Sequence, residues 1–155
     1  MDIKVVYQYE DVMVYAGKPK RDFIKDYILT YDKDFFEPLS ARVNIDIFTE
    51  KLCTQATVFL ALKKGKVAGL IAAYFYAPES KKGYITLTHT KEEFRGQHIA
   101  TYLLDAVTVY AKEKNFKFID LGVYKENVSA YNLYLHYGFK ILCDNGVRCE
   151  MRFTI

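Results

Sequence analysis

Apolar residues recur along the chain with two different periods, one typical of strands and the other of helices. Runs rich in β-branched and aromatic residues, each bounded by residues that favour turns, predict strands. These runs cover residues 3–9, 58–62, 67–77, 84–90, 116–123, 139–143 and 147–153. The turns at 63–66 and 144–146 predict that the second run pairs with the third, and the sixth with the seventh, as hairpins.

Apolar residues spaced three and four positions apart predict four helices between these strands. The helical spacing extends over residues 23–28, 45–52, about 97–114 and about 128–137. Asn127 suits the N-cap of the last helix, and Gly138 suits its C-terminal stop. The order β-α-α-β-β-β-α-β-α-β-β predicts an α/β fold around a mixed central sheet.

The composition is that of an ordinary globular chain. Of the 155 residues, 51% are hydrophobic and 26% are charged, values close to the average for soluble domains. A disordered chain needs lower hydrophobicity and a higher net charge. Collagen-like or Gly/Pro-rich material is excluded because there are only 8 Gly and 3 Pro. The length suits one hydrophobic core, so residues 1–155 are predicted to form a single domain.

Charge and cysteine content exclude further classes of protein. The 22 basic and 19 acidic residues give a net charge of +3, which is too balanced to indicate a nucleic-acid binder. Cys53, Cys143 and Cys149 lack CxxC spacing, so neither a disulfide framework nor a metal site is predicted. No signal peptide is recognisable, and the longest apolar run, residues 67–77, is too short to span a membrane. A cytoplasmic protein is expected.

The segment 93–101 carries the strongest chemical signal, because it joins a predicted strand to a predicted helix. The first turn of a helix has unpaired N–H groups and the positive end of the helix dipole, which together favour a phosphate. Gly96 allows a ligand to approach closely, and Arg95 adds a positive charge. On these grounds alone, an ordinary turn with a surface arginine is the alternative.

Two segments, RGQHIA at 95–100 and NVSAYNLYLHYGF at 127–139, resemble motifs of the GNAT family of N-acetyltransferases. The first resembles its Arg/Gln-x-x-Gly-x-Gly/Ala motif, and the second resembles its Asn-x-x-Ala-x-x-Leu-Tyr-x-x-x-Gly-Phe signature. The spacing of the two segments and the order of elements match as well, over residues 58–153. The resemblance implies a single-domain acetyltransferase fold of the α/β class, with a mixed central sheet and a splayed cofactor cleft flanked by helices.

The same resemblance implies where acetyl-CoA binds as a co-substrate. The cleft lies where the strand 84–90 splays from the strand 116–123, and the pantetheine arm pairs with backbone groups of Thr88, His89 and Thr90. Backbone N–H groups of the phosphate turn hold the pyrophosphate, and they belong to Arg95, Gly96, Gln97, His98, Ile99, Ala100 and Thr101. Asn127 contacts the cofactor, and Ala130 lines its path.

Tyr134 matches the tyrosine that commonly protonates the departing thiolate in this family, so the resemblance implies a general acid. Periodicity alone favours a core aromatic residue, since Tyr131, Leu135 and Tyr137 share its helix. His98 departs from the motif, which has a glycine there. Its N–H remains, but its side chain either adds a positive charge to the phosphate site or weakens binding by its bulk. Both outcomes are left open.

The side chains of the strand 84–90 are predicted to alternate between two faces. His89 then shares a face with Ile85 and Leu87, where a hydrogen-bonded structural histidine is favoured. The opposite face offers hydroxyls and no carboxylate, from Tyr84, Thr86, Thr88 and Thr90. The proton of the amine is therefore predicted to leave through ordered water or to one of three N-terminal carboxylates, which are Asp34, Glu37 and Asp46.

The polar segment 32–38 contains two adjacent phenylalanines, Phe35 and Phe36, which cannot both be exposed to water without cost. The resemblance implies that part of the acceptor pocket lies here, with Phe35, Phe36 and Tyr84 as substrate-binding residues. The alternative is that both phenylalanines belong to the core.

The reaction that this resemblance implies is acetyl transfer from acetyl-CoA to a primary amine by direct attack, with no metal and no cysteine nucleophile. A backbone N–H of the strand ending near Thr90 would polarise the thioester carbonyl. A small-molecule or peptide amine is the expected partner, nucleic acid and membranes are not, and a homodimer is left open. The alternative function is a non-catalytic acyl-CoA-binding sensor or partner-binding module on the same fold.

Overall fold

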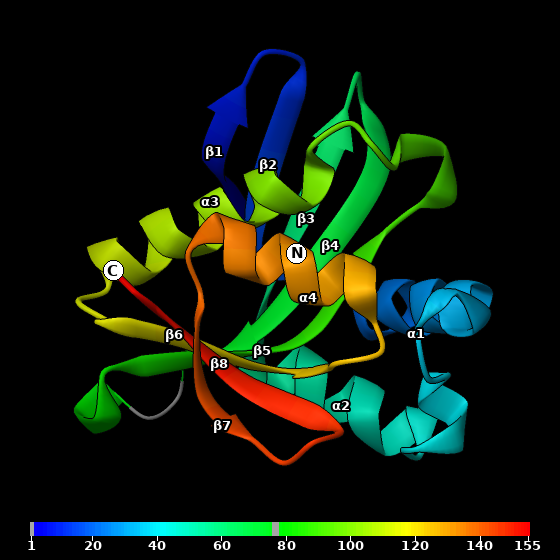
Figure 1. Ribbon diagram of the computed structural model, residues 1–155. Coiled ribbons are helices and arrows are strands. Elements are labelled where there is room, and N and C mark those ends of the chain that lie inside the picture. The colour runs from blue at the N-terminus through cyan, green and yellow to red at the C-terminus, as the bar shows by residue number, and fades with distance from the viewer. Residues whose placement is uncertain (1, 76–77) are drawn as a thin grey trace.

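The computed structural model describes residues 2–75 and 78–155, which form a mixed α/β fold around one eight-stranded sheet (Figure 1). The strands are β1 (Asp2–Tyr9), β2 (Val12–Lys18), β3 (Ala56–Lys63), β4 (Lys66–Tyr74), β5 (Lys82–Thr90), β6 (Phe118–Tyr124), β7 (Lys140–Asp144) and β8 (Arg148–Thr154). The helices are α1 (Arg21–Tyr31), α2 (Ile45–Gln55), α3 (Ile99–Glu113) and α4 (Val128–Tyr137). The spatial order β1-β2-β3-β4-β5-β6-β8-β7 is antiparallel except between β5 and β6, so the predicted mixed sheet is confirmed.

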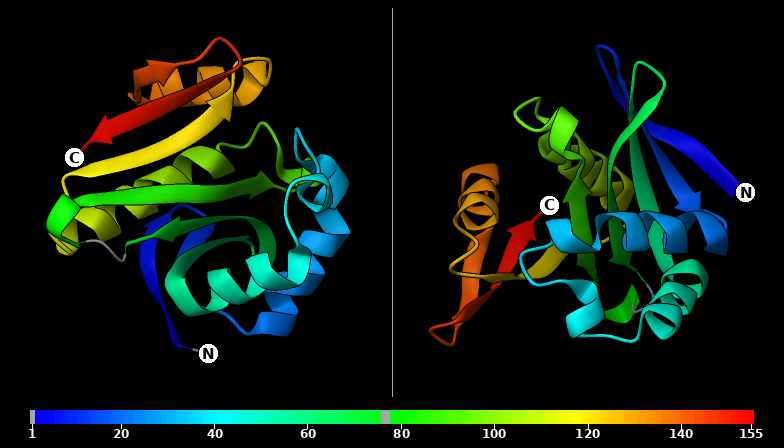
Figure 2. Two further views of the ribbon diagram at one scale, coloured as in Figure 1. Left: turned by 90° about the horizontal axis from the view of Figure 1, so that it is seen from below. Right: turned by 90° about the vertical axis from the view of Figure 1, so that its right-hand side faces the viewer.

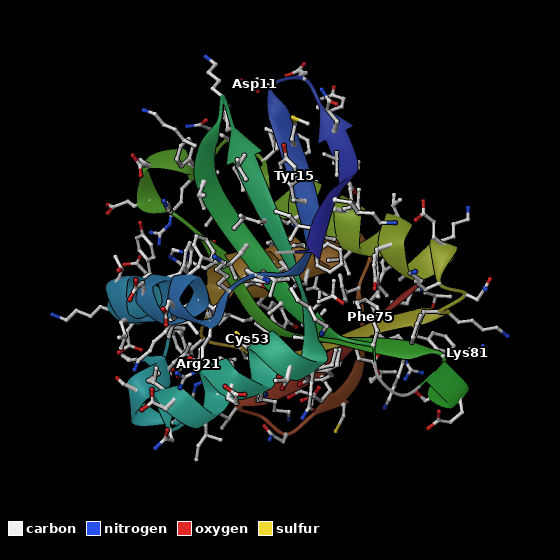
Figure 3. The ribbon with its side chains drawn as sticks, turned by 180° about the vertical axis from the view of Figure 1, so that it is seen from behind. Asp11, Tyr15, Arg21, Cys53, Phe75 and Lys81 are labelled. Atoms are coloured by element: carbon white, nitrogen blue, oxygen red, sulfur yellow. The ribbon has the colours of Figure 1, made fainter. Side chains whose placement is uncertain are left out.

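Helices cover both faces of the sheet, and each face has its own apolar core (Figure 2). The core under α3 and α4 includes Phe59, Ile71, Leu103, Val107, Ile119 and Met151. The core under α1 and α2 includes Ile24, Ile28, Leu52, Val58, Leu70 and Leu87. From behind, α1 and α2 lie in front of one part of the sheet, near the labelled Arg21 and Cys53 (Figure 3). The arrangement leaves the cofactor motif on one face and the segment between α1 and α2 on the other.

The first eighteen residues form a hairpin rather than the single predicted strand. β2 was not predicted, although Val12, Val14 and Ala16 alternate into the core as a half-buried strand requires. The turn residue Glu10 adopts a φ of 52°, and Glu-Asp is not one of the dipeptides that normally indicate a two-residue hairpin turn. The small residues Ala16 and Gly17 further weaken the strand pattern.

The long helix begins later than predicted, at Ile99 rather than near Gln97. Gly96 has a φ of 75° and His98 a φ of 64°, and a right-handed helix requires a negative φ. Two left-handed residues therefore separate the helix from the preceding turn. The second of them is the position where the family motif has glycine, the residue that adopts this conformation at no steric cost.

A bulge in β5 changes which of its side chains share a face. Ala72 pairs with Leu87 and Ala73 with Ile85, so Thr86 is an extra residue without a partner in β4. Ile85 packs in the core under α3, whereas Leu87 packs under α1 and α2, where His89 also lies. The predicted shared face of His89 and Ile85 is therefore wrong, because strict alternation does not survive a bulge.

Close packing at the other end of β5 explains one glycine. A Cβ at Gly83 would collide with the ring of Phe75, which follows β4 and is labelled in Figure 3.

The strand predicted over 67–77 ends at Tyr74, and positions 76 and 77 lie outside the described residues. Within the described parts of the chain, none of the helices has the length and apolar character that crossing a membrane demands.

Candidate active site

The central sheet opens where β5 and β6 diverge. Their parallel pairing extends only from Lys82–Phe118 to Ile85–Leu121. Beyond it, the second half of β5 pairs with β4 alone and the end of β6 pairs with β8 alone. Each strand thus presents one unpaired backbone edge to the opening. An extended ligand arm that carries amide groups can pair with such an edge as an added strand does.

Tyr134 of α4 lies beside the wall that β5 forms. Its side chain is 6% exposed and packs against the ring of Phe139, with 5.6 Å between ring centroids. Burial raises the pKa of Tyr134, and the neighbouring Thr88 hydroxyl acts in the opposite direction. The predicted general acid and a predicted cofactor-binding residue thus lie together. A phenol with its ordinary pKa of about 10 is protonated at neutral pH, and burial shifts the pKa of Tyr134 further in that direction.

The Thr88 hydroxyl is an unusual feature of this wall. Its Oγ1 atom is buried and, although it neighbours the Tyr134 hydroxyl, it makes no hydrogen bond of good geometry within residues 2–75 and 78–155. A buried polar atom without a partner costs free energy, and most such atoms in folded proteins are satisfied by protein groups, water or a ligand. Thr88 therefore offers a free polar group to an occupant of the opening.

The turn before α3 presents a second set of free groups. In the described chain, none of the backbone N–H groups of residues 96–101 donates to an acceptor. The first hydrogen bond of the helix is made by the Tyr102 N–H, which donates to the His98 carbonyl at 3.0 Å. The positive φ angles of Gly96 and His98 bend the backbone ahead of the helix. Several N–H groups and the positive helix end are thus available to an anion.

The side chains of Arg95, Gln97 and His98, all predicted to lie at the phosphate site, have different surroundings in this turn. The His98 ring is exposed and lies 6.3 Å from the ring of Tyr102. Gln97 donates to the Glu93 carbonyl at 3.2 Å, and Arg95 Nε donates to the Thr90 carbonyl at 3.4 Å. Arg95 therefore rests against the end of β5, next to the unpaired N–H groups.

Asn127 and Ala130 lie at the start of α4, on the other side of the opening. Asn127 is the residue before the first helical turn, as predicted, but its side chain makes no capping hydrogen bond. Its backbone carbonyl accepts from Tyr131 at 2.9 Å. Ala130 is half-buried and packs against the core under α3 and α4. The Asn127 amide is thus uncommitted to the helix and free to contact a ligand.

These features fit a ligand with a phosphate end and an extended amide arm. The anion fits the α3 turn, and the arm fits the open edge of β5, the half of the strand to which Thr88 belongs. The fit rests on backbone groups and on small or polar side chains, so it needs no metal ion.

A polar network centred on the buried side chains of Tyr27 and His89 lies on the opposite face of β5, under α1. The Tyr27 hydroxyl is 2.7 Å from His89 Nδ1, and His89 Nε2 is 3.0 Å from Asp34 Oδ2. Because a carboxylate only accepts, Nε2 of a neutral imidazole carries the proton and Nδ1 accepts from Tyr27. Asp34 also lies 3.8 Å from Arg95. The network ties the segment after α1 to the phosphate turn, and it satisfies the structural histidine that the sequence predicts.

The neighbouring segment holds the two phenylalanines in different environments. Phe35 is half-buried, with its ring 5.3 Å from that of His89. Phe36 is 51% exposed, and its ring lies 5.5 Å from that of Tyr124 at the end of β6. One ring thus belongs to the core under α1 and the other covers the end of a strand that borders the opening.

Two charged residues of β8 complete this side, and the sequence interpretation missed them. Arg148 lies 5.4 Å from the Tyr124 ring centroid and 3.6 Å from Glu150, which accepts from the Tyr84 hydroxyl at 3.5 Å. The sequence feature that relates to Arg148 is Gly122, because a Cβ atom at position 122 would collide with the Arg148 guanidinium. Without the register of β6 and β8, nothing in the sequence indicates which side chain takes that space.

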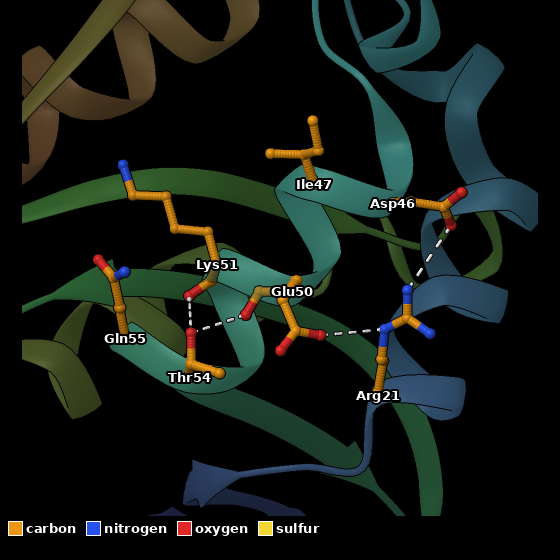
Figure 4. Close-up of a pocket in the computed structure, with 7 residues that line it drawn as sticks. All are labelled: Arg21, Asp46, Ile47, Glu50, Lys51, Thr54 and Gln55. Atoms are coloured by element: carbon orange, nitrogen blue, oxygen red, sulfur yellow. Dashed lines mark hydrogen bonds and ion pairs between the residues drawn. The ribbon is translucent and has the colours of Figure 1, made fainter.

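An open hollow of about 480 Å³ lies elsewhere, along the outer face of α2 (Figure 4). It is lined by Arg21, Asp46, Ile47, Glu50, Lys51, Thr54 and Gln55. Asp46 is engaged there by Lys25 at 2.8 Å and by Arg21 at 3.8 Å. This hollow contains none of the predicted cofactor-binding residues and is distinct from the opening between β5 and β6.

Acidification should destabilise the fold through His89. Burial lowers the pKa of His89 below its ordinary 6.5, although Asp34 acts in the opposite direction. Below about pH 6.5, His89 therefore binds a proton in the unfolded chain but stays neutral in the folded protein. The free energy of unfolding consequently falls as the pH drops. Thermal melts between pH 7.5 and 5.0 should show this fall, and His89→Gln should flatten it. The exposed His136 supplies the control, because His136→Gln leaves the contacts among Tyr27, His89 and Asp34 intact and should keep the fall; equal slopes for His89→Gln and the wild type would contradict the prediction.

Comparison with known proteins identifies relatives of this architecture. The sequence profile of the acetyltransferase (GNAT) family matches residues 21–139. The structure of Ard1 from Thermoplasma volcanium is similar, with a TM-score of 0.70 at 20% identity, over 92% of this chain and 97% of that one. The ribosomal-protein-S18-alanine N-acetyltransferase from Escherichia coli gives 0.72 at 14% identity, over 92% and 94%. The PaiA N-acetyltransferase from Thermoplasma acidophilum, solved in complex with coenzyme A, gives 0.66 at 16% identity, over 92% and 99%.

Proposed function

Because the chain belongs to the acetyltransferase (GNAT) family, we propose that it transfers an acetyl group from acetyl-CoA to a primary amine. The observation that carries the proposal is the combination at one opening of a free anion-binding turn, an unpaired strand edge and the protonated phenol of Tyr134. Acetyl-CoA supplies the activated acyl group as a thioester. The acceptor is a small-molecule or peptide amine.

The roles of the residues follow from their positions. Backbone N–H groups of 96–101 hold the pyrophosphate, and Asn127 and Ala130 border the cofactor. Arg95 contributes its side chain instead of its N–H, because that N–H already donates to the Glu92 carbonyl at 3.2 Å. Backbone groups of Thr88, His89 and Thr90 pair with the pantetheine arm, and an N–H of this edge polarises the thioester carbonyl. Tyr134 donates its proton to the departing sulfur. Phe35, Phe36 and Tyr84 border the side from which the amine arrives.

Acetyl-CoA should stabilise the folded protein. A ligand present at 100 times its dissociation constant adds about 2.7 kcal/mol to the free energy of unfolding when it binds the folded state alone. Thermal melts with rising acetyl-CoA should therefore move to higher temperature. Pantetheine, which lacks the phosphates, should give a much smaller shift because it leaves the α3 turn empty. If millimolar acetyl-CoA leaves the melting temperature unchanged, the proposed cofactor site is wrong.

Turnover separates an enzyme from the alternative, a non-catalytic acyl-CoA sensor. Thiol release from acetyl-CoA, measured against a panel of primary amines, should rise with at least one acceptor, and the product should carry the acetyl group on nitrogen. Tight binding without amine-dependent thiol release across the panel would favour the sensor. The protonated, buried Tyr134 favours the enzyme, because a sensor has no use for an acid at the thioester.

A further inference from the structure

The amine acceptor reaches the site as an ammonium ion at neutral pH and must lose a proton before it attacks. A carboxylate placed to take that proton has to be near the opening and free of other cations. Asp34 is committed to His89 and lies 3.8 Å from Arg95. Asp46 is paired with Lys25 and Arg21 on the outer face of α2. Glu37 is the third carboxylate of this region.

Glu37 has a fixed position and no cationic partner. Its Oε2 atom accepts a hydrogen bond from the Tyr124 hydroxyl at 2.7 Å, and the residue is half-buried. Within the described chain, no Lys, Arg or His nitrogen lies within 4.0 Å of its carboxylate. One phenol thus orients a negative charge that the protein itself leaves unpaired.

Tyr124 places this charge at the opening. It is the last residue of β6, the strand that diverges from β5, and Phe36 packs against its ring. Tyr124 alternates with Val123, which belongs to the core under α3 and α4. Glu37 therefore lies on the side of the sheet opposite Tyr134, so a base and an acid flank the divergence of the two strands.

The neighbouring charges leave Glu37 available. Arg148 and Glu150, from β8, are 3.6 Å apart and offset each other, and Tyr84 of β5 donates to Glu150. Asp34 and His89 are bonded to each other. The Tyr124 ring already faces the Arg148 guanidinium, 5.4 Å from its centroid, so the exposed ring of Phe36 is the aromatic surface left beside the Glu37 anion. An anion next to an aromatic face is the environment that binds an ammonium group, through charge and through cation–π attraction.

We propose that Glu37 binds the ammonium group of the acceptor and takes its proton, as the general base of the acetyl transfer. The inference rests on the proposed function. The ammonium gives one proton to the Glu37 carboxylate, and the neutral amine then forms the C–N bond as the C–S bond breaks. The sulfur takes the Tyr134 proton, and the second proton lost by nitrogen restores the phenol through solvent. Glu37 releases its proton to water, so each turnover liberates one proton, as amide formation from an ammonium requires.

The test is the pH profile of kcat/KM for Glu37→Gln. The probes are benzylamine, a diamine, an amino sugar and a short peptide with a free N-terminus, and the one that the wild type acetylates fastest is used throughout. With Glu37 present, the ammonium form is productive and kcat/KM should stay level from neutral pH up to the pKa of the amine. Without it, only free amine reacts, so kcat/KM should rise about tenfold per pH unit up to that pKa. At pH 7 the loss should be about 10²–10⁴-fold.

Glu50→Gln is the matched control, since it makes the same change at a carboxylate that Arg21 already offsets at 3.2 Å, on the outer face of α2 and away from the opening. Its profile should keep the wild-type shape. Tyr124→Phe should lower the rate less than Glu37→Gln, because it removes only the positioning hydrogen bond. Thermal melts with acetyl-CoA show whether each variant folds and binds the cofactor.

The outcomes separate this inference from the function on which it rests. If Glu37→Gln keeps the wild-type pH profile, or is lowered equally at every pH, Glu37 is not the base even though the protein is an acetyltransferase. If the wild type neither binds acetyl-CoA nor acetylates any probe, the proposed function fails and the role of Glu37 falls with it.

Discussion

Tyr134→Phe should lower kcat by about 100-fold and leave the affinity for acetyl-CoA nearly unchanged. General acid catalysis contributes about 10²–10⁴-fold. The low end is expected because a thiolate is a stable leaving group, with an ordinary thiol pKa near 8.5, and burial raises the pKa of Tyr134 further above that value. The loss falls on kcat because the proton is delivered mainly in the transition state.

The measurement is steady-state thiol release with an accepted amine, for the wild type and the variant. Phenylalanine keeps the ring that packs against Phe139, so the fold should persist. Tyr131→Phe is the matched control, because it removes a hydroxyl from the same helix one turn earlier and should leave kcat unchanged. A Tyr134→Phe protein that turns over at the wild-type rate, with chemistry rate-limiting, would reduce Tyr134 to a core aromatic residue.

Most elements of the fold were predictable from local pattern, and the exceptions have local causes. The helices and the C-terminal hairpin follow from periodicity and from the Asp-Asn-Gly turn at 144–146. β2 was missed because its turn lacks the usual residues, although its burial alternates as in any half-exposed strand. The start of α3 was misplaced because a sequence does not show that His98 adopts a left-handed conformation.

The two sides of the candidate site differed in how far the sequence could predict them. The cofactor side is built from consecutive residues at a strand–helix turn, so a motif of six residues describes it. The acceptor side joins the segment after α1 to the ends of β6 and β8, which are about a hundred residues away in the chain. Glu37 was one of three equivalent carboxylates until the hydrogen bond from Tyr124 distinguished it. The bulge at Thr86 also separated Tyr84 from Thr88, and alternation had placed the two on one face.

A carboxylate placed in the first turn of α3 should affect the free protein and its complex in opposite directions. Thr101 is the third residue of α3. Thr101→Asp puts a negative charge near the positive end of the helix dipole, which should raise the stability of the free protein by about 0.3–1 kcal/mol. The same charge faces the site proposed for the pyrophosphate. Two like charges a few ångströms apart near a protein surface repel by about 1–4 kcal/mol, so the Kd for acetyl-CoA should rise about 10- to 100-fold or more.

Asn115→Asp is the matched control for Thr101→Asp, because it adds the same charge just beyond the opposite end of α3, where the backbone also has a positive φ. There the dipole is negative, so stability should fall slightly while the Kd for acetyl-CoA stays at the wild-type value. Calorimetric titrations at low salt and at 0.5 M salt give the second readout, since screening should shrink the difference between Thr101→Asp and the wild type. Equal weakening by both variants would show only a dependence on net charge, and an unchanged Kd for Thr101→Asp would place the phosphates away from this turn.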